Sequence, residues 1–126
     1  MIDRKRGLEK RETKRVKARE DAYAVFRPTF TKLGQIIDIS WGGLAFCYPV
    51  TGDKTTGFSE LDIFLTNQGF YLERIPSNTI SDFKIHKRFS HSSMPTRRCG
   101  VKFGALSPFQ VSRLDYFIRN YTLKTD

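Results

Sequence analysis

Two arginines near the start of the chain have the types and spacing of an anion site. Arg15 and Arg19 lie four residues apart, so their side chains share one face of either a helix or an extended strand. Planar guanidinium groups suit phosphate oxygens and the O6/N7 edge of guanine, where they form paired hydrogen bonds. The spacing therefore indicates one anionic ligand for both arginines, and Lys14 is a further candidate cation beside them.

A second polar group lies in the segment from Asp38 to Gly43. On a strand, Asp38 and Ser40 share one face while Ile37 and Ile39 face the core. A carboxylate accepts hydrogen bonds from the N1–H and the exocyclic amine of guanine, and a hydroxyl both donates and accepts. Gly43 either allows a positive φ at the turn or leaves room for a ligand beside the backbone.

Each of these residues also has a purely local explanation. Arg15 and Arg19 could form a solvated charge run, and the side chains of Asp38 and Ser40 could bond to nearby backbone before a glycine-rich turn. Trp41, at the tip of that turn, could stack on a base or pack against the protein. Arg98 could reach the same anion or remain a surface charge.

The elements that position these residues are mainly β. Apolar and β-branched runs predict strands near 23–30, 35–40, 44–48, 61–65 and 98–103, with weaker strand signals over 70–88. Ser107, Pro108 and Gln110 form a capping-box pattern, which predicts a helix over about 107–122. We expect a small antiparallel, split β-barrel of about six strands with a C-terminal helix.

The chain length and the charge distribution divide the protein into two parts. Its 126 residues suit one domain, with a basic, flexible N-terminal arm at 1–20 and the barrel at 21–126. The net charge is +9, with nine Lys/Arg against four Asp/Glu in the arm and nine against three in residues 81–126. Such basic ends favour a polyanionic partner.

Compartment and cofactors are inferred from what the sequence lacks. It contains neither an apolar leader nor a run of about 20 apolar residues, so we expect a cytoplasmic protein without membrane insertion. Cys47 and Cys99 are far apart and outside any C-x-x-C pair, so we expect two reduced, buried thiols and no metal site. No cofactor is expected.

The two motifs together resemble the R-x-x-x-R and D/N-x-S-x-x-G signatures of PilZ domains, in the same order. The resemblance continues through the strand at 100–103 and the following helix, and so covers most of the chain from about Arg15 onward. It implies a receptor for the bacterial second messenger cyclic di-GMP. It also implies which residues bind that ligand: Arg15, Arg19, Asp38, Ser40 and Gly43, with Lys14, Trp41 and Arg98 as further candidates.

Three functions follow as hypotheses. The first is a non-enzymatic cyclic di-GMP receptor whose arm and surface change on binding, and which regulates an unknown protein partner in motility, adhesion or exopolysaccharide production. The second is a PilZ-like protein-interaction module that binds no nucleotide. The third, general nucleic-acid binding by a basic barrel, is disfavoured but compatible with the charge. The sequence shows neither a nucleophile with a nearby base nor a carboxylate dyad, so we do not expect an enzyme.

Overall fold

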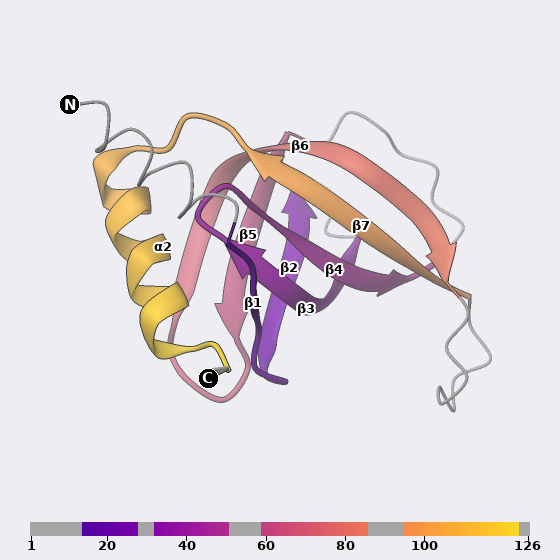
Figure 1. The fold of residues 1–126 in the computed structure, drawn as a ribbon, viewed down its shortest axis with the longest axis horizontal. Helices are drawn as coiled ribbons and strands as arrows, with labels where there is room; N and C mark the ends of the chain where they lie inside the picture. Colours follow the sequence, from indigo (N-terminus) through magenta and orange to yellow (C-terminus); the bar gives the residue numbers. More distant parts are fainter. Residues whose placement is uncertain (1–13, 28–31, 51–58, 86–94, 124–126) are drawn as a thin grey trace.

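The computed structural model describes residues 14–27, 32–50, 59–85 and 95–123, which are mainly β (Figure 1). Residues 1–13 of the expected N-terminal arm lie outside these ranges. In chain order the described elements are β1 (Val16–Lys17), β2 (Ala22–Arg27), β3 (Leu33–Ser40), β4 (Gly43–Pro49), β5 (Glu60–Leu65), β6 (Tyr71–Ile85), β7 (Thr96–Phe103) and α2 (Pro108–Asn120).

Six of the strands form a closed antiparallel barrel, which confirms the predicted fold. Their order is β3-β2-β5-β6-β7-β4, and pairing between β4 and β3 closes the ring. The short strand β1 lies outside the ring and pairs with β3, with Val16 opposite Ile39 and Lys17 opposite Asp38. The arginine-bearing end of the expected arm is therefore paired with the barrel.

Large apolar side chains from all sides fill the barrel, because alternate residues of each strand point inward. Phe26 and Phe46 meet inside the ring with their centroids 5.7 Å apart. Cys47 and Cys99 are free and buried, as predicted. Other fully buried members of the core are Ile39, Leu44, Leu61, Ile63, Leu72 and Ile75.

Helix α2 begins at the predicted capping box. The backbone amide of Gln110 donates to the Ser107 hydroxyl (3.1 Å), and the backbone amide of Ser107 donates to the Gln110 side-chain oxygen (3.0 Å). Leu114, Phe117 and Ile118 are buried against the barrel, whereas Val111 is half exposed. Figure 1 shows the helix lying along one side of the barrel.

Strand β3 carries a bulge that changes which isoleucines enter the core. Ile36 pairs with Phe46 and Asp38 pairs with Ala45, so Ile37 is the extra residue. Ile36 is buried, Ile39 is fully buried, and Ile37 is only partly buried. The expectation that Ile37 faces the core was wrong, because a bulge resets the alternation of a strand.

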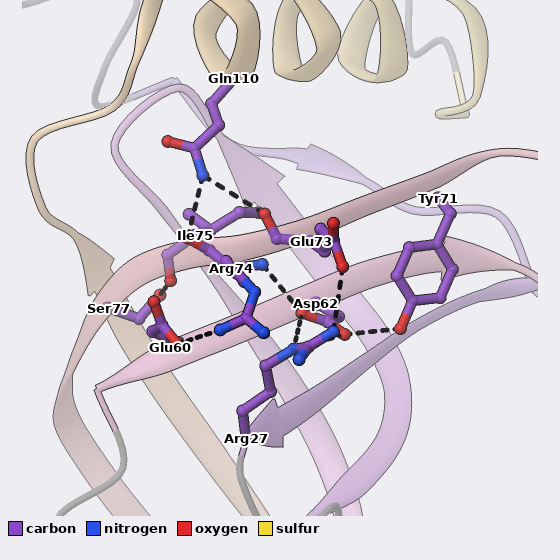
Figure 2. A network of polar contacts seen from close by, with 9 residues as sticks. All are labelled: Arg27, Glu60, Asp62, Tyr71, Glu73, Arg74, Ile75, Ser77 and Gln110. Atoms are coloured by element: carbon purple, nitrogen blue, oxygen red, sulfur yellow. Dashed lines mark hydrogen bonds and ion pairs between the residues drawn. The ribbon is translucent and has the colours of Figure 1, made fainter.

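The weakly patterned region 70–88 contains one long strand, β6, held at a second bulge by the buried carboxylate of Asp62 (Figure 2). Asp62 accepts from the Arg27 side chain (2.9 and 3.0 Å), the Tyr71 hydroxyl (2.5 Å) and the Arg74 amide (2.9 Å). Arg74 has a positive φ of 58°. The Gln110 side chain donates to the Arg74 carbonyl (2.9 Å), which ties the start of α2 to this bulge.

Candidate functional site

Asp38 is the meeting point of two arginines that are far apart in the sequence. The Arg15 guanidinium lies 2.9 Å from one carboxylate oxygen, and the Arg98 guanidinium lies 3.6 Å from the other. The side chains of Arg15 and Arg98 are each 38% exposed and that of Asp38 is 21% exposed. Three of the residues that the sequence singled out therefore form one accessible cluster.

The cluster lies on the outer face of the barrel, across a floor of small residues, Ala45 on β4 and Gly100 on β7. Leu44 and Phe46 point into the core, so Ala45 between them faces outward. The register places Ala45 between Asp38 of β3 and Gly100 of β7. Because alanine and glycine rise little above the sheet, the Arg98 side chain can pass over β4 to reach Asp38.

Arg19 points to a different place from Arg15. Its Nε lies 3.3 Å from the Asp21 carboxylate, and its guanidinium lies 5.8 Å from the ring centre of Tyr121. The other Asp21 oxygen is buried and has no hydrogen-bond partner within the described residues. The described conformation thus separates the two motif arginines, with Arg15 at Asp38 and Arg19 at the end of α2.

The segment that carries the arginines touches two parts of the protein at once. On one side β1 pairs with β3, and the Ala18 amide donates to the Ile37 carbonyl (3.1 Å). On the other side the Leu123 amide donates to the Lys17 carbonyl (2.8 Å), and Ala18 forms a β-bridge with Thr122. Residues 14–19 therefore lie between the barrel and the chain that follows α2.

Ser40 and Gly43 serve the turn between β3 and β4. The Ser40 hydroxyl donates to the Gly43 carbonyl (3.4 Å) and accepts from the Gly42 amide (3.2 Å), and Ser40 is almost fully buried. Gly43 does not have a positive φ; instead, a Cβ there would lie 2.2 Å from the carbonyl oxygen of Val101. Glycine is required at this position because strand β7 passes so close.

Trp41 packs against the helix rather than standing free at the turn. Its indole N–H donates to the Asp115 carboxylate of α2 (2.9 Å). Together they form one wall of a cavity of about 530 Å³. The cavity is also lined by Lys102, Leu106, Val111 and Leu114.

The remaining candidate for the ligand site, Lys14, is exposed.

Arg97, next to Arg98, faces a different environment. It donates to Asp82 (2.7 Å), which also accepts from the Tyr48 hydroxyl (2.7 Å) and from Lys32 (3.3 Å). Burial by itself raises the pKa of Asp82, but the hydrogen bonds from Tyr48, Arg97 and Lys32 outweigh it, and the pKa is lowered. Burial and the Asp82 contact raise the pKa of Tyr48. Arg97 is therefore paired with Asp82, whereas its neighbour Arg98 is paired with Asp38.

No family model and no curated protein matches the sequence. Among the described residues, no group of three or more His, Cys, Asp or Glu side chains is placed to hold a metal ion. None of the described helices has the length and apolar character needed to cross a membrane.

Proposed function

We propose that the protein is a cytoplasmic, non-enzymatic receptor for cyclic di-GMP, whose ligand lies on the outer face of the barrel at Arg15, Asp38 and Arg98. The observation that carries the proposal is the convergence of two arginines on one carboxylate above the low floor of β4. The two PilZ-like motifs contribute one partner each, Arg15 and Asp38. The third partner, Arg98, comes from β7.

The chemistry of this cluster fits a guanine nucleotide with phosphate groups. The arginine forks bind phosphate oxygens or the O6/N7 edge of guanine, and Asp38 accepts from the guanine N1–H and amine. The two guanidinium groups share the single carboxylate of Asp38 in partly exposed ion pairs. Exposed ion pairs contribute only about 0 to 1 kcal/mol each, so a ligand can replace them at small cost.

The contacts of residues 14–19 provide a route from ligand to surface. A ligand that draws Arg15 or Arg19 to its phosphates moves a segment that is hydrogen-bonded to Leu123 and stacked near Tyr121. The end of α2 then changes its exposure or position. A protein partner in motility, adhesion or exopolysaccharide production that recognises this end would respond to the ligand.

A second candidate function, a protein-interaction module without nucleotide, is favoured by the cavity beside Trp41. Val111, which lines this cavity, is half exposed, and Phe109, two residues before it on α2, is mostly exposed. Neither side chain belongs to the barrel core. Nucleic-acid binding, the third hypothesis, predicts a steep loss of affinity with salt and no preference among nucleotides.

The test is isothermal titration calorimetry of the purified protein with cyclic di-GMP. Cyclic di-AMP, GTP and single-stranded DNA, which are also anionic, are the comparison ligands. Arg15→Ala and Arg98→Ala are the informative variants, because both side chains are partly exposed. Arg119→Ala on α2 removes the same charge and is the matched control, since its ion pair is with Asp115. Arg19→Ala is less informative, because it leaves the buried Asp21 carboxylate without its cation.

Saturable binding of cyclic di-GMP that both site variants weaken and Arg119→Ala preserves supports the receptor. Equal binding of every anion, lost at high salt, supports nucleic-acid binding instead. An absence of heat with all ligands contradicts the receptor and favours the interaction module.

A further inference from the structure

Two apolar side chains of β6 are exposed beside the proposed ligand site. Ile80 is 62% exposed and Phe83 is 48% exposed. Asp82, the neighbour of Phe83, turns inward to the buried Tyr48, so Phe83 points to the outer face of the barrel. Ile80 lies at a register shift between Thr79 and Ser81 and is the extra residue of a third bulge.

The register places Phe83 and Ser81, the residue after Ile80, on the same face as the cluster at Asp38. Phe83 lies opposite Arg98 on β7, and residues opposite one another in an antiparallel pair share a face. Ser81 lies opposite Gly100, which is followed across the sheet by Ala45 and then by Asp38. The outer face therefore runs from β6 to β3, with Arg98 between the apolar residues and the carboxylate.

Gly100 allows side chains of β6 to pack closely over β7. A Cβ at Gly100 would lie 2.5 Å from the Ser81 hydroxyl oxygen and 3.7 Å from Cγ1 of Ile80. Both side chains thus lie over the glycine. Gly100 and Ala45 are themselves buried, so the outer surface here is formed by Ile80 and Phe83 on one side, by Arg98 between, and by Asp38 on the other side.

We propose that Phe83 and Ile80 form an apolar wall against which the face of a purine base packs, while Arg98 binds its edge or the adjacent phosphate. This inference rests on the proposed function, because it assigns a role within the same site. Aromatic side chains stack on bases without reading their sequence. The wall would therefore select a ligand with a purine ring over inorganic phosphate or a sugar phosphate.

The experiment measures cyclic di-GMP affinity for wild type, Phe83→Ala, Ile80→Ala and Phe83→Trp. Phe109→Ala is the matched control, since Phe109 is an exposed phenylalanine on α2. We expect Phe83→Ala to weaken binding by about tenfold, Ile80→Ala by less, and Phe83→Trp to retain it. Thermal unfolding of each variant checks the fold, and Phe83 is exposed enough that its truncation should preserve it.

The outcomes separate this inference from the proposed function. If wild type binds and Phe83→Ala binds equally well, the apolar wall is wrong and the receptor stands. If wild type binds and Phe109→Ala is weakened as much as Phe83→Ala, the effect is not specific to the wall, and the inference fails. If wild type does not bind, both fail together.

Discussion

The Arg15 guanidinium and the Asp38 carboxylate, 23 residues apart, approach to 2.9 Å on the outer face of the barrel. One belongs to a segment outside the closed ring and the other to a strand within it. Arg98 approaches the same carboxylate from β7. The pairing holds a basic segment against the barrel surface through partly exposed ion pairs, which are weak in water.

Removing the Asp38 carboxylate should separate guanine recognition from phosphate binding. Asp38→Ala frees Arg15 and Arg98 from their counter-ion, so phosphate contacts persist while the acceptor for guanine is lost. We expect affinity for cyclic di-GMP to fall ten- to a hundredfold, since a hydrogen bond to a charged group contributes about 1.5 to 3 kcal/mol. Preference over cyclic di-AMP should shrink as well.

Titration calorimetry with both dinucleotides measures this effect, and urea denaturation measures the stability of the variant. Because the ion pairs are exposed, the free energy of unfolding should fall by no more than about 1 kcal/mol. Undiminished preference for cyclic di-GMP in Asp38→Ala would show that Asp38 does not read the base.

The Asp62 network predicts a stability effect without a binding effect. Asp62→Ala removes, at a fully buried position, the acceptor of the Arg27 Nε–H and of the Arg74 backbone amide. We expect the free energy of unfolding to fall by about 3 kcal/mol or more, as for other buried ion pairs that lose one partner. Urea denaturation measures it.

Glu73→Ala is the control for that variant, because Glu73 pairs with the same arginine but its side chain is 60% exposed. Its cost should stay below about 1 kcal/mol. Equal destabilisation by the two variants would contradict the conclusion that the Asp62 hydrogen bonds stabilise the bulge in β6.

Capping and turn chemistry made much of the fold predictable. Ser107 and Gln110 predict the start of α2 because the two residues of a capping box are only three positions apart in the sequence. The length of β6 was not predictable in the same way. Arg74 and Ile80 lie at bulges that interrupt the two-residue alternation by which a strand is recognised.

The site was predictable only where it is local. Asp38, Ser40 and Gly43 belong to one turn, and Arg15 belongs to a recognisable motif. The roles of Ala45 and Gly100 depend on the register of β4 against β3 and β7, which no local pattern specifies. Likewise, the contact of Arg19 with Asp21 and Tyr121 depends on where α2 ends against β1.

Acid should destabilise the protein through its two networked aspartates. Burial opposes ionisation of Asp62 and Asp82, but their hydrogen bonds outweigh it, so both pKa values are lowered in the folded state. The folded protein then binds fewer protons than the unfolded chain near pH 4. The stability they contribute is present above about pH 4, the unfolded value, and is lost as the pH falls through their folded pKa values.

Urea midpoints measured from pH 7 to pH 3 test this dependence. Asp82→Asn keeps the shape of the side chain but removes its titration, so its midpoint should fall less steeply with acid than that of wild type. An equally steep decline in Asp82→Asn would contradict the role of Asp82.

The two cysteines should be unreactive in the native protein. Burial raises the pKa of Cys99 to about 11, and Cys47 is also buried. Since the thiolate is the reactive form, a disulfide-exchange reagent at pH 8 should label neither thiol until the chain unfolds. Labelling in concentrated urea provides the control, and rapid labelling of two thiols without urea would contradict their burial.

The most direct test of the central claim is an NMR titration of the 15N-labelled protein with cyclic di-GMP. We predict saturable amide shifts in residues 14–19, 38–45 and 98–102, with further shifts at Thr122 and Leu123 through their contact with β1. Unchanged spectra, or shifts confined to the cavity residues Leu106 and Val111, would contradict a cyclic di-GMP site on this face of the barrel.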